Sequence, residues 1–478
     1  MSFAVRIRQD ELLGRVVRNS AHLFTSNAAS LALSVLQGLL AARMLGPAGY
    51  GLVGIVMSYA STVNGLLSFR MGELVVRYGG QYLEEGDKSR AAALIKLSAL
   101  AELAVSWLAF LVVALTAGVA ARFAAKTPGI EWMFVLYGLV LLCNFNAETA
   151  TGVLQITNKI KTRGKLNLIQ AIFSAATVVA VFIWNEREGV GAGTALLAVL
   201  AAYLLGKAIL GVGLFVAGWL ELDRVLGREW RHADISTLPS LRGLFGIALS
   251  SNLSATAILV FRESEVLWVG LFLNNEAAGL YKVAYTIVGL LSVPADPLIL
   301  SVYPEANRLV VQKAWGRLED FLKKITSLSF LYNIALALGL LVLGRWVLSI
   351  FGEQYTVAFP VILALLPGMV FNYTLFWNRP LLLSFGLQNF ALGAIVVAGV
   401  LKVVLAIPLV PRYGYVMEAT LLSLYYIISV GLIVWRGLRE LNRRMAPAKA
   451  LQPGDKELQA RRVRPDRADR DNSDLSGR

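Results

Sequence analysis

The amino-acid sequence predicts an all-α integral membrane protein with about twelve transmembrane helices, arranged as two parallel six-helix lobes around a central cavity. Three observations lead to this fold class: the composition, the length of the apolar runs and an internal repeat. Of the 478 residues, 57% are hydrophobic and only 16% are charged, and the mean hydropathy is +0.63. Soluble domains are much less apolar and carry more charge, so a polytopic membrane protein is indicated.

The apolar residues form runs long enough to cross a bilayer, which takes about 20 residues of helix. Glycine, proline, asparagine or a cluster of charges bounds each run. In the first half the predicted spans are 20–42, 50–75, 92–118, 132–156, 165–184 and 190–218. In the second half they are 243–272, 279–303, 320–343, 357–378, 384–408 and 414–437.

Lysine and arginine gather in alternate loops, about 18 in one set against about 6 in the other, as the positive-inside rule requires. This bias places both termini in the cytoplasm. The predicted organisation is an amphipathic segment 1–19, an N-lobe 20–218, a cytoplasmic linker 219–242, a C-lobe 243–438 and a disordered cytoplasmic tail 439–478.

The second half of the chain repeats the first. The stretch "LGPAGYGLVGIVMSYASTVNGLL" from Leu45 aligns with "LNNEAAGLYKVAYTIVGLLSVPA" from Leu273 at a shift of 228 residues, which pairs Gly51 with Gly279. Because each half contains an even number of spans, the repeats are parallel and related by an axis along the membrane normal. Two such lobes predict a cavity that opens alternately to either side of the membrane.

Several kinds of chemistry find little support in the sequence. Cys143 is the single cysteine, and His22 and His232 are the two histidines, so we expect no catalytic triad and no metal site. No glycine-rich loop ending in Lys and Ser or Thr is present, so ATP hydrolysis is not expected. The formal net charge of +14 fits cytoplasmic loops better than a nucleic-acid partner.

Three motifs resemble the polysaccharide-exporter (Wzx-type) flippases, in the superfamily that also holds the lipid II flippases and the multidrug and toxin extruders. They are "ARMLGPAGYGL", "VVRYGGQYLEEGDKSR" and "RESEVLWVGLFLNNEAAGLYKVAYTI". The resemblance implies translocation of polyprenyl-pyrophosphate-linked oligosaccharides, such as O-antigen or exopolysaccharide repeat units, from the cytoplasmic to the periplasmic leaflet of the inner membrane. It further implies that membrane lipids, polysaccharide polymerase and export machinery are partners.

Charged residues inside the predicted spans are the candidate site, because each costs about 2.5–3.5 kcal/mol at bilayer depth and therefore should face the cavity or a partner. Four are predicted to contact the pyrophosphate or glycan, since cations bind phosphate oxygens. These are Arg70, Arg262, Lys207 and Lys402. In the alternative interpretation, Arg70 with Glu73 and Arg262 with Glu265 only neutralise each other, and the two lysines extend toward the membrane interface.

Four carboxylates are predicted to pair with these cations or to bind a coupling ion, Na⁺ or H⁺. They are Glu73, Glu265, Glu148 and Asp296. Glu73 and Glu265 each follow an arginine by three residues, which would place both charges on one helix face. Asp296 lies between Pro294 and Pro297, where it could bind a cation or serve in a hinge.

Two other functions stay open at this point. A cation-coupled extruder of drugs or other small molecules would have the same fold, but its cavity should be acidic rather than rich in Arg and Lys. A membrane glycan polymerase or ligase should carry a long periplasmic loop or an acidic motif outside a helix, and every loop inferred on that side is short.

Overall fold

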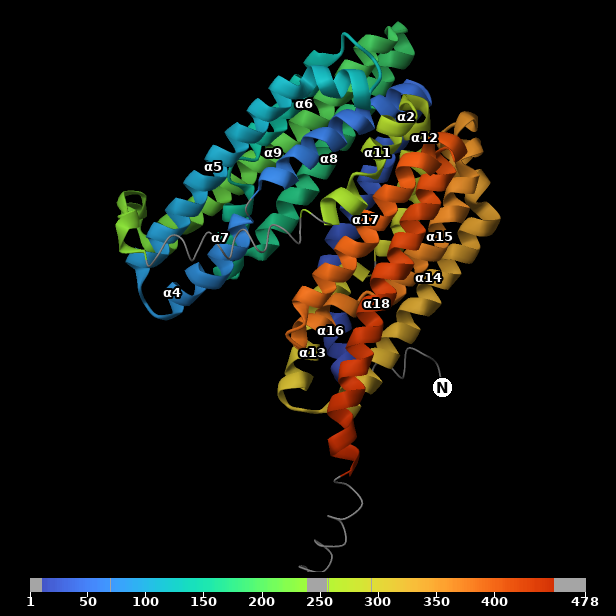
Figure 1. Ribbon diagram of the computed structural model, residues 1–478. Coiled ribbons are helices and arrows are strands. Elements are labelled where there is room, and N and C mark those ends of the chain that lie inside the picture. The colour runs from blue at the N-terminus through green and yellow to red at the C-terminus, as the bar shows by residue number, and fades with distance from the viewer. Residues whose placement is uncertain (1–10, 69, 239–255, 257, 294, 451–478) are drawn as a thin grey trace, which may run out of the picture.

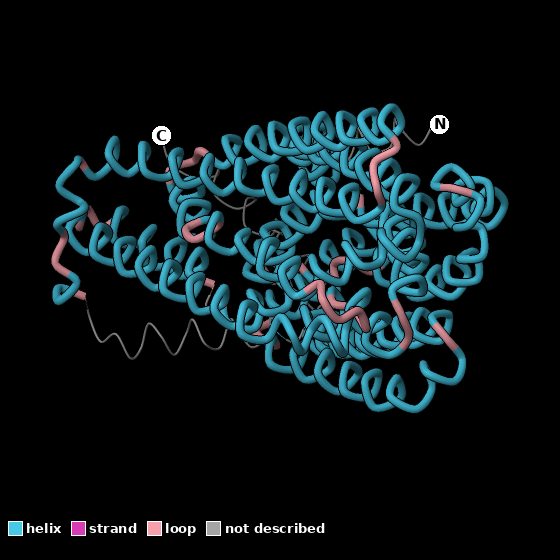
Figure 2. Tube along the Cα trace, turned by 90° about the horizontal axis from the view of Figure 1, so that it is seen from above, coloured by secondary structure: helices cyan, strands magenta, loops and turns pink. Residues whose placement is uncertain are grey.

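The computed structural model describes residues 11–68, 70–238, 256, 258–293 and 295–450. In these ranges nearly every residue is helical, the connections are short and there is no strand, so the predicted all-α class is confirmed (Figure 2). The elements up to residue 238 are α2 (Glu11–Leu67), α3 (Met71–Leu74), η1 (Val75–Gly79), α4 (Gly80–Glu84), α5 (Lys88–Val119), η2 (Ala120–Ala124), α6 (Glu131–Cys143), α7 (Ala147–Ile156), α8 (Ile160–Glu188), α9 (Ala192–Leu226), η3 (Arg228–His232) and η4 (Ile235–Thr237). The later elements are η5 (Leu259–Glu263), α11 (Glu265–Phe272), α12 (Asn275–Gly289), η6 (Leu290–Ser292), α13 (Ala295–Val311), α14 (Trp315–Phe351), η7 (Glu353–Ala358), α15 (Phe359–Thr374), α16 (Asn378–Ser384), α17 (Gln388–Tyr413) and α18 (Tyr415–Ala450).

The helices form two groups that meet at one end and diverge toward the other (Figure 1). Helices α4 to α9 make most of one arm, which belongs to the predicted N-lobe, and α12 to α18 make most of the other, which belongs to the predicted C-lobe. The arms join where α2, α11 and α12 lie together. At the diverging end lie α4 and α7 of one arm, and α13 and α16 of the other.

Nine helices in the described ranges are long and apolar enough to cross a membrane, so the chain is a multi-pass membrane protein. One of them, Ala29–Leu67, covers the larger part of each of the first two predicted spans, 20–42 and 50–75. These are separated only at Gly46, whose φ of 66° and ψ of 177° are not helical. Pro47 follows at a position that suits the first turn of a new helix. The predicted total of twelve spans stays a prediction.

The two glycines that the repeat pairs lie against each other where α2 crosses α12. A Cβ atom on Gly51 would stand 1.8 Å from the carbonyl oxygen of Asn275, and one on Gly279 would stand 1.9 Å from that of Pro47. No side chain fits at such distances, so the backbones of the two helices are in direct contact. The related halves of the sequence therefore meet through related residues.

Parts of two segments that were predicted to lie outside the lobes continue helices of the lobes, while residues 239–242 of the predicted linker lie outside the described residues. Beyond the predicted boundary at 218, α9 continues to Leu226, and the buried indole of Trp230 then donates to a carboxylate oxygen of Asp223 at 2.8 Å. Residues 439–450, predicted to belong to a disordered tail, are helical because α18 continues to Ala450. Glu440 on that extension accepts a hydrogen bond from Arg444 Nε at 2.8 Å. The rest of the predicted tail, 451–478, lies outside the described residues.

Candidate functional site

Each arm contains a pocket of similar size. The C-lobe pocket has a volume of about 490 Å³ and the N-lobe pocket one of about 480 Å³. The polar side chains that line the C-lobe pocket are Arg262, Tyr303, Asn372, Tyr373, Asn378, Arg379, Gln388, Tyr425, Tyr426 and Ser429. Those that line the N-lobe pocket are Arg70, Glu73, Arg77, Asn144, Glu148, Thr151, Gln155, Arg163 and Asn167.

A broken helix lies beside each pocket, at related places in the two halves. The predicted span 132–156 divides into α6 and α7 at residues 144–146, and the predicted span 357–378 divides at residues 375–377, before α16. Asn144 and Asn378 stabilise the breaks by donating their side-chain amides to the carbonyls of Val140 (2.8 Å) and Leu375 (2.7 Å). Irregular backbone at membrane depth is tolerated where it lines a cavity, and both breaks do so.

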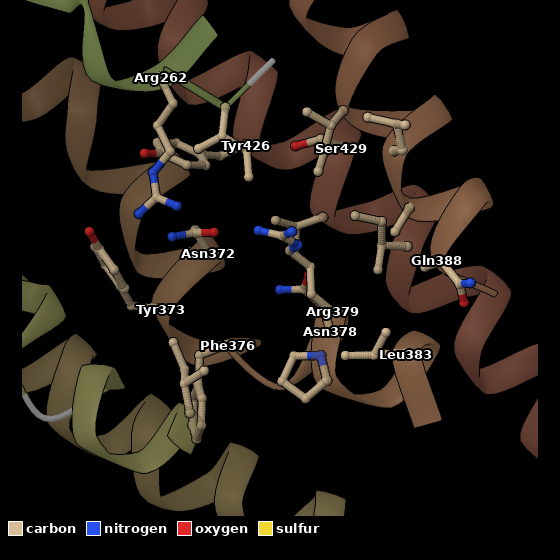
Figure 3. A pocket seen from close by; sticks show the side chains of 18 of the residues that line it. Arg262, Asn372, Tyr373, Phe376, Asn378, Arg379, Leu383, Gln388, Tyr426 and Ser429 are labelled. Atoms are coloured by element: carbon tan, nitrogen blue, oxygen red, sulfur yellow. The ribbon is translucent and has the colours of Figure 1, made fainter. Parts of the chain in front are cut away.

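Two arginines enter the C-lobe pocket from different elements (Figure 3). Arg262 belongs to η5, a single π-helical turn, and its guanidinium stands 5.6 Å from the ring centre of Tyr426. Arg379 follows the α15/α16 break and is exposed to the pocket. Asn372 lies between them in Figure 3, so two guanidinium groups and an amide face one space.

Arg70 lies at a break between helices rather than inside one, which corrects the predicted span 50–75. Helix α2 ends at Leu67, and Arg70 has a left-handed φ of 51° before α3 begins at Met71. The predicted pairing with Glu73 is present at 3.9 Å, but the two side chains are 44% and 59% exposed. An ion pair this open is weak, so both groups remain available to a ligand in the N-lobe pocket.

Charges from the two lobes act on one another across the space between the pockets. Arg379 of the C-lobe experiences the positive charges of Arg262 and Arg70 and the negative charge of Glu73. Within the N-lobe pocket, Arg70 in turn acts on the carboxylate of Glu148. Three guanidinium groups, from Arg262, Arg379 and Arg70, therefore lie in this region together with the carboxylates of Glu73 and Glu148.

The family described as "Polysaccharide biosynthesis protein" matches residues 16–309, which is more than half of the chain. The chain belongs to this family. Its match begins in α2 and extends through α13. It therefore covers the whole N-lobe pocket together with Arg262 and Glu265 of the C-lobe.

Two relatives of this family member extend over most of its length. "Inner membrane protein YghQ" of Escherichia coli is 25% identical over 73% of this chain and 95% of its own. "Probable low-salt glycan biosynthesis flippase Agl15" of Haloferax volcanii is 20% identical over 87% of this chain and 82% of its own.

Solved structures share the fold. An inward-facing multidrug resistance MATE transporter of the MOP superfamily superimposes with a TM-score of 0.65, at 14% identity over 87% of this chain and 95% of its own. The lipid II flippase MurJ, in an inward closed conformation, gives 0.63 at 15% identity over 88% of this chain and 89% of its own. The family member thus has the two-lobed architecture of these transporters.

Lys402 does not contact the cavity, which corrects its predicted role as a substrate ligand. It is only 3% exposed and forms ion pairs with Glu265 and Glu418, while lining neither pocket. The alternative pairing of Arg262 with Glu265 is also wrong, because Glu265 turns to Lys402 and to the hydroxyl of Tyr281. Burial of Lys402 and Glu265 together satisfies both charges without the pocket arginine.

The remaining predicted site residues have different placements. Glu148 lines the N-lobe pocket at the first turn of α7. Lys207 is partly buried on α9, one turn before the pocket residue Leu210, and lines neither of the two pockets. Asp296 belongs to the first turn of α13, and its side chain lies outside the described residues. Roles for these side chains remain predictions.

Arg379 lines the C-lobe pocket but is not among the predicted site residues. One signal could have found it: Pro380 follows it directly inside the apolar stretch Glu353–Ser384, and proline inside such a stretch marks an interruption of the helix. An arginine beside such an interruption lies where irregular backbone lines a cavity.

Helix α7 is held in place by a carboxylate from a different helix. Glu102 on α5 accepts the backbone N–H groups of Glu148 and Thr149, both at 2.9 Å, and so acts as an N-cap supplied by a neighbour. In the C-lobe the corresponding break is tied to α14, because the indole of Trp377 donates to the hydroxyl of Thr326 at 2.7 Å.

Replacing Glu102 with alanine should loosen the first turn of α7. Loss of an N-cap costs about 1–2 kcal/mol, so amide hydrogen exchange in segment 147–152 should quicken roughly 5- to 30-fold. Hydrogen exchange of the protein in detergent, read by mass spectrometry, measures this. The matched control is Glu131→Ala at the exposed start of α6, which should leave segment 147–152 unchanged. Equal exchange in both variants would contradict the capping role.

Proposed function

We propose that this protein is a flippase that moves polyprenyl-pyrophosphate-linked oligosaccharides from the cytoplasmic to the periplasmic leaflet of the inner membrane, with both termini in the cytoplasm. Membership of the polysaccharide biosynthesis protein family supports the glycan pathway. The shared architecture of a lipid II flippase and of multidrug transporters supports alternating access rather than catalysis. A relative named as a glycan biosynthesis flippase supports both the glycan pathway and the transport function.

The observation that carries the proposal is that Arg262 and Arg379 face one pocket of the C-lobe, while Arg70 lines the pocket of the other lobe. A pyrophosphate carries several oxygen acceptors close together. One guanidinium group can donate two parallel hydrogen bonds to such oxygens. Arginine also keeps its charge at any working pH. A binding site shared by both lobes would be broken and remade as the lobes move, which is what a transported anion requires.

The pockets supply groups suited to the glycan as well. Asparagine, glutamine, serine and tyrosine side chains can exchange hydrogen bonds with sugar hydroxyls, and these residue types line the C-lobe pocket. Amides and a threonine line the N-lobe pocket. In this mechanism the head group occupies the space between the lobes, while the polyprenyl tail stays in the lipid. An ion gradient, or consumption of the glycan outside, provides the driving force.

Deleting the gene in its host tests the proposal. Surface polysaccharide should disappear and lipid-linked repeat units should accumulate on the cytoplasmic side. Wild type should restore the polymer, Arg262→Ala should not, and Arg262→Lys should restore it partly. Normal surface polysaccharide together with new sensitivity to cationic drugs would overturn the flippase and favour an extruder of the same fold.

A further inference from the structure

Behind the C-lobe pocket lies a cluster of ionisable side chains that is closed to water. We call it the buried triad: Glu265 on α11, Lys402 on α17 and Glu418 on α18, which are 1%, 3% and 0% exposed. Lys402 contacts a carboxylate oxygen of Glu265, and its Nζ stands 2.9 Å from Oε1 of Glu418. The hydroxyl of Tyr281 on α12 donates to Glu265 at 2.7 Å.

The charges in the triad do not balance. Two carboxylates and one ammonium leave a net charge of −1 with no path to solvent. The deficit lies at Glu418, since Glu265 receives two donors while neither oxygen of Glu418 accepts a well-directed hydrogen bond from any residue that the structure describes. An uncompensated charge in such surroundings costs several kcal/mol.

We propose that the buried triad binds one proton, shared by its two carboxylates, and that this proton is the coupling ion of the transport cycle. Addition of one proton to two carboxylates and one ammonium gives a neutral cluster. A metal cation such as Na⁺ would need the space between the carboxylates, which the ammonium of Lys402 already occupies. The role as coupling ion rests on the proposed transport function, whereas the proton site does not.

The other ionisable groups near the triad do not remove its negative charge. Arg262 of η5 is positive, but its guanidinium is turned over the ring of Tyr426 in the pocket. The other groups that act on the triad or on Arg262 are the carboxylate of Glu263 on η5, one more pocket arginine and several tyrosines. They are Glu263 of η5, Tyr281 and Tyr285 of α12, Tyr373 of α15, Arg379 of α16, and Tyr425 and Tyr426 of α18.

The triad is linked to the pocket through the π-helical turn that carries Arg262. The ammonium of Lys402 stands 3.4 Å from the carbonyl oxygen of Phe261, the residue before Arg262. The hydroxyl of Tyr285 lies 3.5 Å from the carbonyl oxygen of Arg262 itself. Gain or loss of the proton changes how strongly the two carboxylates hold Lys402, and so affects the backbone of η5. This gives the proton a physical route to the anion site.

Infrared spectroscopy of the purified protein in nanodiscs tests the proton site without any substrate. The wild type should show a carboxylic acid C=O band from a buried, protonated side chain that weakens as the pH is raised. Glu418→Gln, which mimics the protonated group in shape and charge, should lack the band. Glu440→Gln is the matched control, because Glu440 is a buried carboxylate on the same helix that faces Arg436, Arg443 and Arg444.

Binding of the same proton should also shift the equilibrium between two arrangements of the lobes. If the neutral triad belongs to the conformation described here, raising the pH should favour the alternative conformation, by up to tenfold per pH unit for one linked proton. Spin labels on Ser89→Cys and Gln312→Cys, in a Cys143→Ser background, report the separation of the arms. Both Glu418→Gln and Glu265→Gln neutralise the triad and should abolish the response, while Glu440→Gln should keep it.

Three outcomes would overturn the proton site: an acid band that persists in Glu418→Gln, a pH response that survives in both triad variants, or a conformational response to replacing choline chloride with NaCl at constant ionic strength. If the gene deletion did not affect surface polysaccharide, the proposed flippase function would be refuted, but the proposed proton site would not.

Discussion

Arg262→Ala and Arg379→Ala should each weaken the binding of inorganic pyrophosphate roughly 10- to 100-fold. A hydrogen bond to a charged group contributes about 1.5–3 kcal/mol, which corresponds to that range. Because both guanidinium groups face the same space, the double variant should lose less than the product of the single losses. Isothermal titration of the protein in nanodiscs measures these affinities.

The controls for this experiment separate geometry from charge. Arg379→Lys keeps the positive charge but not the planar pair of donors, so its affinity should fall between those of wild type and Arg379→Ala. Arg412→Ala removes an exposed arginine at the end of α17 that lines neither pocket, and should bind as wild type does. Equal affinity in wild type and in the double variant would refute a pyrophosphate site at these arginines.

The second large effect should come from the crossing of α2 and α12. A Cβ on Gly51 would stand 1.8 Å from the carbonyl oxygen of Asn275, so Gly51→Ala forces the two helices apart. Overpacking of this kind costs about 1–3 kcal/mol, which should reduce the population of the present conformation roughly 5- to 100-fold. The separation between labels at Ser89 and Gln312 reads this change.

Gly289→Ala serves as the control on the same helix, because a Cβ there would meet no atom within 4 Å. It should leave the distribution of label distances unchanged. Gly279→Ala should act as Gly51→Ala does, since its Cβ would stand 1.9 Å from the carbonyl oxygen of Pro47. If Gly51→Ala kept the wild-type distribution in folded protein, the crossing would not hold the lobes together.

Features with a local signature could be predicted from the sequence. The apolar runs predicted the class of fold. A helix that crosses a membrane takes about 20 residues and must form all its backbone hydrogen bonds within itself. The repeat predicted that Gly51 and Gly279 are equivalent, and their contact is what a shared axis would produce. Arg262 lines a pocket, as expected of a charge at that depth, while its contact with a substrate stays a prediction.

Features that depend on contacts distant in sequence could not be predicted. Spacing suggested that Arg262 and Glu265 pair, but Ser264 ends the π-helical turn and Glu265 begins α11. The partners of Glu265 come from residues 137 and 16 positions away, Lys402 and Tyr281. Helix breaks were missed at residues 144–146 and 375–377 because both interrupt runs whose hydropathy alone reads as one span.

The two pockets come from repeated halves of one sequence, yet their linings differ. One is rich in tyrosine, while the other mixes arginines with carboxylates. A cavity with true twofold symmetry would hold a head group equally well in two orientations related by the axis. The difference between the halves removes that degeneracy. A sugar chain that enters between the two halves therefore meets two chemically different walls. This difference can distinguish its phosphate end from its outer end.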